Sequence, residues 1–499
     1  ALAGTSAIDG AVITLDLRTL ETARHVVVRR PQCPRCGDPR EQSRAAPVPP
    51  SLERRARQFT ADGGHRVTTP EQTLARYGHH VSPITGIVPR LVRLPLDDAG
   101  SLQVYSAGLN RAMATDSLHS LRPGLRSHNS GKGLSEAQAR ASALCEALER
   151  YSGCIDGGET IVRASYRELG ERAIHPNTCM LFSDAQYRDR ARWNARGSGF
   201  QYVPEPFEET VTIEWVPVWS LSRSEFRYLP ASFCYFEHRG AGADFCRGDS
   251  NGNAAGNTLE EAILQGFFEL VERDAVAVWW YNRLRRPAVD LGSFESKQID
   301  ELRAAYATLG REVWVLDLTH DLGIPTFVAV SRRAGGAGEE LLVGFGTHTD
   351  AQVGVTRALT ELNQFVAMTL TRDSRTPSER DDPELAHWLA TATAENQPYL
   401  VPSAEPPRRR CDYETPPDGD LRDEVLRCRS LVERLGLEML VLDQTRPDIG
   451  LPVVKVVVPG LRHFWARFAP GRLYEVPVRL GWRERPATEA ELNPIPMFL

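Results

Sequence analysis

Two helix-forming segments of the chain carry the same charged triplet on an otherwise apolar background. The segment "SEAQARASALCEALERYSG" contains Glu-x-x-Glu-Arg at residues 146–150, and "NTLEEAILQGFFELVERDAVAVWWYNR" repeats it at residues 269–273. Residues three and four positions apart share a helix face, so both carboxylates and the arginine of each triplet project together. Helices this apolar are expected to be buried, so the fold has to accommodate carboxylates in its interior.

Buried carboxylates repel one another unless a cation lies among them. Further polar residues share the same faces: Ser142 on the first helix, and Asn257, Glu261 and Gln265 on the second. Since the glutamates outnumber the arginines, a hard divalent cation is the simplest counter-charge, and Mg²⁺ prefers a few carboxylates together with phosphate oxygens. The arginines, and Lys132 of the nearby Gly-Lys-Gly, would then face those phosphates. The alternative is an exposed face with intrahelical ion pairs, which two matching copies on apolar helices disfavour.

The order of segments predicts an α/β (α+β) fold of mixed β-sheets and long helices. "GREVWVLDLTHDLGIPTFVAVS" (310–331) resembles "GLEMLVLDQTRPDIGLPVVKVVV" (436–458), and both are typical of a strand, a turn and a second strand. Together with the doubled triplet, this similarity suggests two related halves. We divide the chain into a short N-terminal appendage (1–40), a linker (41–61) and a body (62–499) with a loop-rich, partly disordered insertion at 372–422.

Charge and cysteine content argue against several classes of protein. The net charge of −6 over 499 residues, with basic residues scattered along the chain, gives no global attraction to nucleic acid or to an anionic membrane. No apolar stretch is long enough for a transmembrane helix. Nine scattered cysteines are typical of reduced thiols, so we expect a cytoplasmic protein. The common nucleotide signatures are absent, because "NSGKGLS" is not a P-loop and "GFGTHT" is not a dinucleotide-binding loop.

Four stretches together resemble the YcaO family, whose members bind ATP through glutamate-rich helices. They are "GKG", "SALCEALERYSG", "GNAAGNTLEEAILQGFFELVERDA" and "GVTRALTELNQ", in that order between about residues 85 and 370. In addition, "TTPEQTLARYGHHVSPITGIV" is similar to the azole-forming branch, the cyclodehydratases that modify ribosomally made peptides. The resemblance implies an ATP- and Mg²⁺-dependent enzyme that converts Cys, Ser or Thr of a precursor peptide to thiazoline or oxazoline rings by phosphorylating the backbone amide oxygen.

The resemblance also implies roles for individual residues. The implied nucleotide-binding residues are Lys132, Ser142, Glu146, Glu149, Asn257, Glu261, Gln265, Glu269, Glu272, Arg273 and Arg357. The implied Mg²⁺ ligands are Glu146, Glu149, Glu261, Glu269 and Glu272. The implied catalytic residues are Lys132, Arg273 and three residues of a C-terminal tail thought to reach the active site, Pro494, Pro496 and Leu499. The tail departs from the family's Pro-x-Pro-x-Pro, because Phe498 stands where the third proline would be.

Cys33 and Cys36 in "CPRCG" have the spacing of half a zinc site, a knuckle of the Cys-x-x-Cys type. Two unliganded thiols in a turn are the alternative. The surrounding "HVVVRRPQCPRCGDP" resembles the end of the E1-like, leader-peptide-binding domain often fused ahead of this YcaO branch. The resemblance implies a second cysteine pair, either upstream or on another protein.

The implied partners are a precursor peptide, an E1-like or other leader-binding protein and a separate flavin dehydrogenase that oxidises azoline rings, and we expect a homodimer. Two alternatives stay open: a YcaO enzyme of other chemistry, such as backbone thioamidation or amidine formation, or a catalytically silent scaffold that presents a leader peptide. His128, His320 and His348 are candidate proton carriers, although lone histidines are more often hydrogen-bonded structural residues.

Overall fold

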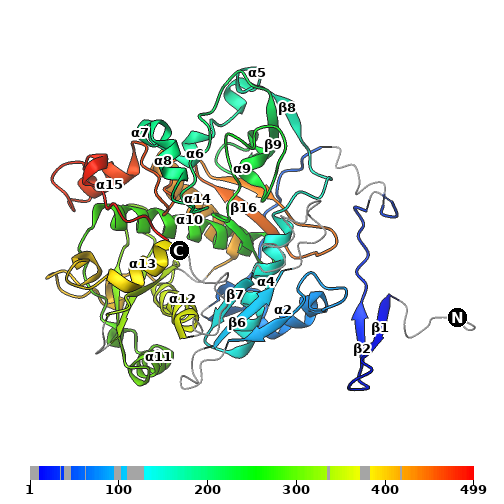
Figure 1. Cartoon of the computed structure of the whole chain (residues 1–499), viewed down its shortest axis with the longest axis horizontal. Helices are drawn as coiled ribbons and strands as arrows, with labels where there is room; N and C mark the ends of the chain where they lie inside the picture. Colours follow the sequence, from blue (N-terminus) through cyan, green and yellow to red (C-terminus); the bar gives the residue numbers. More distant parts are fainter. Residues whose placement is uncertain are drawn as a thin grey trace, which may run out of the picture.

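The computed structural model describes residues 10–33, 35–38, 46–61, 63–94, 103–109, 128–333, 338–370, 383–415 and 419–498. Its mixed sheets and long helices confirm the predicted fold class (Figure 1). The α-helices in these ranges are α2 (Pro70–Tyr77), α4 (Glu136–Ser152), α5 (Tyr166–Leu169), α6 (Asn177–Met180), α7 (Asp184–Arg188), α8 (Arg190–Asn194), α9 (Ala231–Cys234), α10 (Leu259–Asn282), α11 (Lys297–Thr308), α12 (Ala351–Leu370), α13 (Pro383–Thr391), α14 (Leu421–Arg434) and α15 (Arg472–Arg479).

The strands form three sheets and two isolated hairpins, all with antiparallel pairing. The hairpins are β1 (Ala11–Leu15) with β2 (Thr22–Val26), and β3 (Phe59–Ala61) with β4 (Gly64–Arg66). The three-stranded sheets are β5 (Leu91–Arg93), β6 (Gln103–Gly108) and β7 (His128–Gly133), and β12 (Arg311–Asp317), β13 (Thr326–Arg333) and β14 (Leu342–Thr347). The largest sheet has the order β10–β9–β15–β16–β11 with β8 beside β9, formed by β8 (Val162–Ala164), β9 (Ile213–Ser220), β10 (Glu225–Pro230), β11 (Asn253–Ala255), β15 (Leu440–Asp443) and β16 (Val453–Val457).

Both helices that carry the charged triplet begin at a capping side chain. The Ser135 side chain accepts a hydrogen bond from the backbone N–H of Gln138, and Gly153 ends α4. Thr258 caps α10 in the same way. Because the apolar face of α4 is covered by β6 and β7, and α10 is buried for most of its length, the triplets are held inside the molecule.

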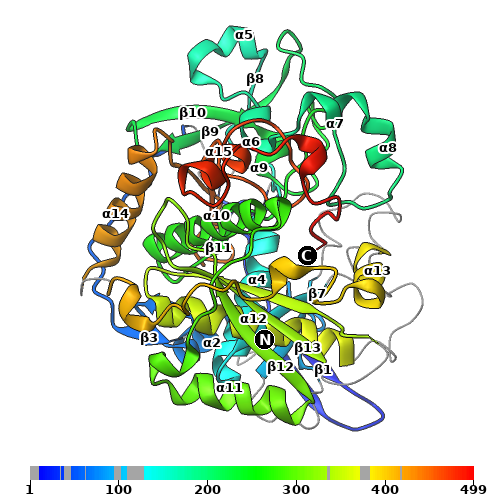
Figure 2. The same ribbon diagram turned by 90° about the vertical axis from the view of Figure 1, so that its left-hand side faces the viewer.

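Helices α4 and α12 lie unusually close to the strand that precedes each of them. A Cβ placed on Gly131 of β7 would lie 2.2 Å from the Ala139 carbonyl oxygen of α4. A Cβ on Gly346 of β14 would lie 2.2 Å from the Gly354 carbonyl oxygen of α12. Glycine is therefore required at both positions, since any other side chain would push the helix away from its sheet. Figure 2 shows α12 behind the β12–β13 strands.

The two segments predicted to be related both fold as antiparallel hairpins, but in different surroundings. Residues 310–331 form most of β12–β13 in a three-stranded sheet, whereas residues 436–458 form β15–β16 within the six-stranded sheet. The predicted strands are thus correct. The structural repeat that organises the site is a different one, described below.

The predicted insertion at 372–422 is more ordered than expected over its described part. Residues 371–382 and 416–418 lie outside the described ranges. Between them, α13 and the segment that follows bury Trp388, Tyr399 and Leu400 in the main hydrophobic core, beside Trp279 and Trp280 of α10. This apolar burial explains why a segment rich in Pro and charge is held in place.

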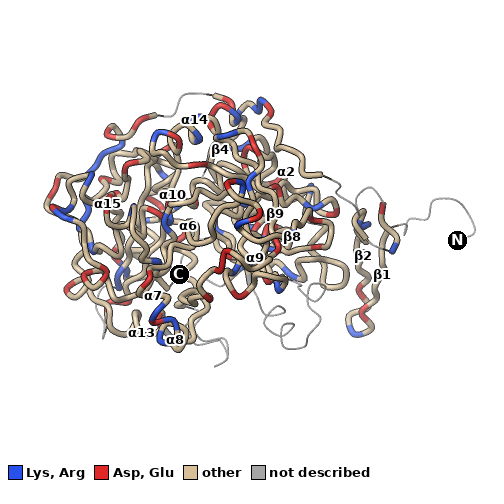
Figure 3. The backbone as a smooth tube through the Cα atoms, turned by 90° about the horizontal axis from the view of Figure 1, so that it is seen from above, with Lys and Arg blue, Asp and Glu red and all other residues tan. Residues whose placement is uncertain are grey.

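Most of the N-terminal hairpin β1–β2 projects from the body (Figures 1 and 3), while the end of β2 and the chain after it contact the body. His25 Nδ1 lies 2.9 Å from Ser82 Oγ, inside the "SPITG" turn, and Gln32 donates to Asp448 at 2.6 Å. The described part of the predicted linker is packed as well: Ala56 bridges Asp420, and β3 forms part of the site. Basic and acidic positions are interspersed along the backbone in Figure 3.

Candidate active site

One large cavity of about 640 Å³ lies between α4, α10 and α12, with β7, β14 and the β3–β4 hairpin completing its walls. It brings together every residue predicted to bind nucleotide: Lys132, Ser142, Glu146, Glu149, Asn257, Glu261, Gln265, Glu269, Glu272, Arg273 and Arg357. They come from segments more than two hundred residues apart in the sequence, so the fold gathers them into a single site. Their role in binding a nucleotide stays a prediction.

Three helices, not two, supply the same four positions to this cavity. In each helix the four residues occupy positions i, i+4, i+7 and i+8, which lie along one face. The sets are Ser142, Glu146, Glu149 and Arg150 on α4; Gln265, Glu269, Glu272 and Arg273 on α10; and Arg357, Glu361, Gln364 and Phe365 on α12. Sequence analysis missed the third set because Gln364 and Phe365 replace the second glutamate and the arginine of the motif.

Five carboxylates and three cations meet at one end of the cavity. The carboxylates belong to Glu146, Glu149, Glu269, Glu272 and Glu361. Lys132 Nζ lies 2.5 Å from the Glu361 carboxylate, and Arg273 lies 3.0 Å from Glu272 and 3.9 Å from Glu269. Arg150 lies 3.6 Å from Glu146. The cluster thus carries more negative than positive charge, and a bound divalent cation would restore the balance.

Burial raises the pKa of these carboxyl groups. Desolvation is the largest cause for Glu146, Glu149 and Glu269, and it raises the pKa of Glu272 to about 7 against the pull of Arg273. Neighbouring glutamates add to the shift; Glu361, for example, raises the pKa of Glu272 and Glu269. Groups that resist ionisation in the absence of a cation are well suited to bind one, because the metal offsets the cost of burying their charge.

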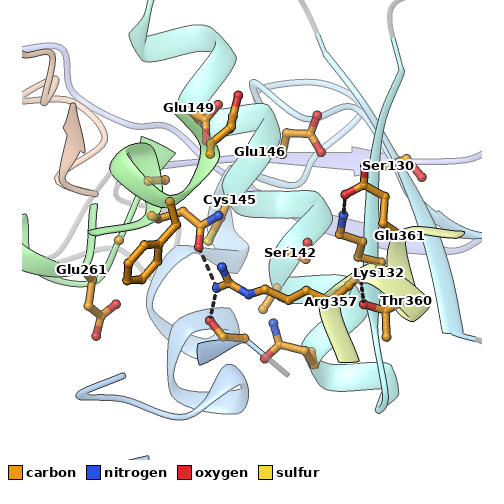
Figure 4. Close-up of a pocket in the computed structure, with 18 of the residues that line it drawn as sticks. Ser130, Lys132, Ser142, Cys145, Glu146, Glu149, Glu261, Arg357, Thr360 and Glu361 are labelled. Carbon is orange, nitrogen blue, oxygen red and sulfur yellow. Dashed lines mark hydrogen bonds and ion pairs between the residues drawn. The ribbon is translucent and has the colours of Figure 1, made fainter. Parts of the chain in front are cut away.

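Glu261 differs from the other predicted Mg²⁺ ligands. Its side chain is completely buried, and its two oxygens accept hydrogen bonds from the backbone N–H groups of Val67 (2.7 Å) and Asn257 (2.9 Å). Figure 4 shows it across the cavity from Glu361 and away from Glu146. Both oxygens accept a backbone hydrogen bond, so Glu261 helps to fix the start of α10, and its role as a Mg²⁺ ligand stays a prediction.

The end of the cavity near Glu261 is closed by the β3–β4 hairpin. Arg357 of α12 donates to the Gly63 carbonyl oxygen at 2.9 Å and to Gln265 Oε1 at 2.7 Å, which ties the hairpin to two helices. Phe59 and Arg66 of the hairpin line this end together with Phe268 of α10. Sequence analysis assigned Phe59 to a linker, since a three-residue strand in an Arg-rich segment has no recognisable period.

Neither of the two predicted proton carriers whose side chains are described, His320 and His348, lines the cavity. His348 and His320 are buried outside its lining, and burial together with Arg357 holds the pKa of His348 well below its usual range. His348 belongs to a cluster with His65 and Glu424 whose ligand atoms lie within 4.8 Å. A metal there is disfavoured: His65 already contacts Glu424 and Arg57, and Arg66 and Arg357 lie close by. The side chain of His128 lies outside the described part of the structure.

Cys145 lies on α4 and lines the cavity, but burial raises the pKa of its thiol to about 12. A thiol with so high a pKa is a poor nucleophile at neutral pH. Cys145, the one cysteine that lines the described cavity wall, is therefore poorly suited to act as a nucleophile.

The C-terminal tail is anchored in the core rather than lining the described cavity wall. Phe498 packs against the rings of Trp280 and Trp388, and Gln201 donates to the Met497 carbonyl oxygen at 2.8 Å. Pro494 is exposed and Pro496 is buried. Leu499 lies outside the described residues, so the predicted catalytic role of the tail stays a prediction.

The knuckle at Cys33 and Cys36 has the expected tight geometry. The two sulfurs lie 3.5 Å apart, and the backbone N–H of Gly37 donates to the Cys33 carbonyl oxygen at 2.9 Å. Backbone hydrogen bonds from Arg35 and Cys36 are the largest causes that lower the pKa of the Cys33 thiol, which favours the thiolate form that zinc binds. This geometry fits half of a zinc site, and zinc binding stays a prediction.

A glutamate-rich cavity between three helices, without a P-loop, defines a class of ATP-binding proteins distinct from the common nucleotide folds. Comparison with known families agrees: residues 130–462 match the model described as YcaO cyclodehydratase, ATP- and Mg²⁺-binding. The matched range covers all three helices. The chain belongs to the YcaO family, as its motifs predicted.

Known proteins match most of this chain. A heterocyclase solved in complex with substrate and cofactor is 47% identical with a TM-score of 0.90, and the match covers 98% of this chain and 65% of that one. The heterocyclase TruD is 44% identical with a TM-score of 0.77, covering 98% and 61%. An uncharacterized protein of Methanothermobacter thermautotrophicus is 30% identical over 79% of this chain and 94% of its own. The chain thus spans less than two thirds of either heterocyclase. None of the helices in the described ranges is long and apolar enough to cross a membrane.

Proposed function

We propose that this protein is an ATP- and Mg²⁺-dependent peptide cyclodehydratase. One observation carries the proposal: five glutamates and two arginines from three helices converge with Lys132 of β7 on one cavity. A hard divalent cation suits this donor set, and triphosphate oxygens would complete its coordination. The family match and the two similar heterocyclases support the assignment.

The two ends of the cavity suggest how a nucleotide would lie. The phosphates belong at the carboxylate end, where Mg²⁺ would bridge them to Glu146, Glu149, Glu269 and Glu272, and where Lys132, Arg150 and Arg273 supply positive charge. The nucleoside belongs at the end closed by the β3–β4 hairpin, between Phe59 and Phe268. Asn257, Gln265 and Arg357 offer hydrogen-bonding groups there. Glu361 holds Lys132 in position.

The proposed reaction needs charge stabilisation more than a protein nucleophile. A Cys, Ser or Thr side chain of the peptide loses its proton and attacks the preceding carbonyl carbon, forming an oxyanion. That oxyanion takes the γ-phosphoryl group as the bond to the β-phosphate oxygen breaks and ADP leaves. The carbon–oxygen bond then breaks, phosphate departs with the oxygen, and the nitrogen loses a proton to give the azoline. Lys132 and Arg273 neutralise the charge that passes between these groups.

The first test is nucleotide binding by the chain alone, followed by turnover. Calorimetry should detect ATP only with Mg²⁺ present, and Glu272→Gln should abolish that binding in a folded protein. Turnover with a Cys-rich precursor peptide should remove one water per modified residue with one ATP consumed each time, measured by mass spectrometry. Binding that survives Glu272→Gln would contradict the site assignment. Binding without loss of water from any peptide would point to the other YcaO chemistries or to a scaffold.

The partners follow from the same proposal. The exposed knuckle and the hairpin β1–β2 suit an E1-like or other leader-binding partner, and a second cysteine pair from it would complete a zinc site with Cys33 and Cys36. Zinc analysis of the chain with and without that partner tests this point. A separate flavin dehydrogenase would oxidise the azolines, and sedimentation would test the expected homodimer.

A further inference from the structure

A second, smaller cavity of about 70 Å³ lies on the other side of Arg273 from the large one. Arg273 lines both cavities, and the segment 249–251 separates them: Ser250 faces the large cavity, whereas Asp249 and Asn251 face the small one. The volume is a little over twice that of a water molecule in the liquid, about 30 Å³, so it suits one small group rather than a nucleotide. Its apolar walls include Phe182, Tyr202, Phe233 and Leu270.

The charged side chains of this small cavity are mostly cationic. Its lining contains four arginines, Arg247, Arg273, Arg462 and Arg467, against one carboxylate, that of Asp249. Asp249 is already engaged, because His463 Nε2 lies 3.2 Å away and the buried Lys455 lies 3.9 Å away. The small cavity is thus short of negative charge.

Two of the arginines are buried, and within the described residues their guanidinium groups donate hydrogen bonds to backbone carbonyl groups. Arg467 donates to the carbonyl oxygens of Ala466 (2.9 Å) and Phe200 (3.2 Å), and Arg462 donates to those of Ala469 (2.7 Å) and Pro470 (2.6 Å). Burial lowers the pKa of both guanidinium groups to about 10, and the opposing effect of Asp274 on Arg462 and of Asp249 on Arg467 is smaller.

Two of the arginines that line this cavity each have a buried donor without an acceptor among the described residues. In the described structure the Nε–H groups of Arg273 and Arg462 are buried and have no hydrogen-bond partner. Such groups are rare in folded proteins and call for a missing acceptor. Arg247 lies over the Tyr202 ring at 3.4 Å and is exposed to solvent, so its guanidinium group is available to a ligand entering from outside.

We propose that this small cavity binds one oxyanion, a phosphate or a carboxylate, against Arg247, Arg273 and Arg462. The inference rests on the proposed function, because Arg273 would then touch the reacting phosphates on one side and the bound oxyanion on the other. Two sources share this chemistry: the inorganic phosphate that the reaction releases, and a carboxylate of the peptide substrate close to the reacting residue. The cavity is too small for either to bind with a long attached chain inside it.

The test is calorimetric titration of inorganic phosphate into the full chain, with the large cavity occupied by Mg²⁺ and a non-hydrolysable ATP analogue. Phosphate is expected to bind with one equivalent, and Arg247→Gln should weaken it by about tenfold, the effect of one charged hydrogen bond. Arg239→Gln, at an exposed arginine of the same loop that lines neither cavity, should leave the affinity unchanged. The same titration without nucleotide shows whether the small cavity binds phosphate even if the large cavity does not bind ATP.

A kinetic comparison separates the two sources. If the peptide supplies the carboxylate, Arg247→Gln raises KM for a peptide with Glu beside the reacting residue and leaves KM for its Gln counterpart unchanged, whether or not phosphate binds. If released phosphate is the ligand, added phosphate inhibits without competing with ATP, and Arg247→Gln relieves that inhibition. The proposal is overturned if the wild-type chain shows neither phosphate binding with the analogue present nor a KM difference between the two peptides.

Discussion

Helices α4 and α12 pack on their preceding strands in the same way but present different side chains to the cavity. Each follows a strand in which a glycine, Gly131 or Gly346, lets the helix backbone pack directly on the sheet. Each then presents positions i, i+4, i+7 and i+8 to the cavity. On α4, as on α10, the last two positions are glutamate and arginine, whereas on α12 they are Gln364 and Phe365.

This difference separates two tasks within one site. Helices α4 and α10 form walls of paired carboxylates and arginines, which suit metal and phosphate. Helix α12 keeps a single carboxylate, Glu361, and that one holds Lys132 at 2.5 Å. Its first position, Arg357, donates hydrogen bonds to the β3–β4 hairpin and to Gln265. Helix α12 therefore positions Lys132 and Gln265, which act together with the side chains of α4 and α10.

The prediction with the largest expected effect compares ATP turnover after substitution of glutamates at the same motif position on α10 and α12. Glu269→Gln removes a proposed Mg²⁺ ligand, so ATP turnover should fall by roughly 100-fold or more, as for loss of one preorganised electrostatic contact. Glu361→Gln, at the matching position of α12, removes the ion pair that positions Lys132 but no proposed metal ligand. Turnover should therefore fall by only about tenfold. Steady-state ATPase assays with peptide measure both values.

Glu171→Gln serves as the control, because Glu171 is exposed and lines neither cavity. Circular dichroism must show that each variant is folded. Equal losses for Glu269→Gln and Glu361→Gln would mean that α12 is a third metal-binding wall, and the division of tasks would be wrong.

The second prediction concerns the shared scaffold. Gly131→Ala places a methyl group 2.1 Å from the Ala143 backbone nitrogen, and Gly346→Ala places one 2.4 Å from that of Ala358. Neither helix backbone can move without leaving its sheet, so each variant should lower the free energy of unfolding by roughly 1–3 kcal/mol or more. Denaturant unfolding measures the loss.

Gly78→Ala is the matched control, since its Cβ would meet nothing within 4 Å. Its φ of −60° is one that alanine adopts readily, so its stability should stay the same or rise slightly. If Gly131→Ala were as stable as Gly78→Ala, the close approach of strand and helix would not be what holds α4 in place.

Sequence alone predicted the parts of the site that repeat a strong local pattern. The doubled triplet identified the residues of α4 and α10 that line the cavity. The set on α12 was visible only as part of the family resemblance, through Arg357. Its Gln and Phe remove the charge pattern, although the helix period that places all four residues is unchanged.

Other features depended on contacts between distant segments, which no local pattern reports. Glu261 has the same residue type and helix face as the proposed metal ligands, yet a backbone N–H from Val67, almost two hundred residues earlier, occupies one of its oxygens. Phe59 lies in a segment with no clear period and reaches the site through a three-residue strand. The tail was predicted from its prolines, but Phe498 packs on Trp280 and Trp388, which are far away in sequence.

The third prediction uses the raised pKa values of the carboxylate walls. A carboxyl group whose pKa is raised on folding makes the folded state less stable as the pH rises through that pKa, because the unfolded state ionises more easily. With the pKa of Glu272 at about 7, the metal-free protein should lose stability between pH 6 and pH 8. Mg²⁺ should therefore raise the melting temperature more at pH 8 than at pH 6, measured by differential scanning fluorimetry. An equal shift at both values would mean that these carboxylates do not bind the metal.

The smallest expected effect comes from converting the third wall into a copy of the other two. Gln364→Glu restores Glu-x-x-Glu on α12 beside Glu361 and Glu272, where the carboxylates already outnumber the cations. If α12 only orients its neighbours, the added charge should make the metal-free protein less stable at pH 8 and change turnover at saturating Mg²⁺ by no more than about threefold. Gln364→Met, which keeps the size without the charge, should show no pH-dependent loss. A large gain in Mg²⁺ affinity for Gln364→Glu would show instead that α12 has the geometry of a metal-binding wall and lacks only the carboxylate.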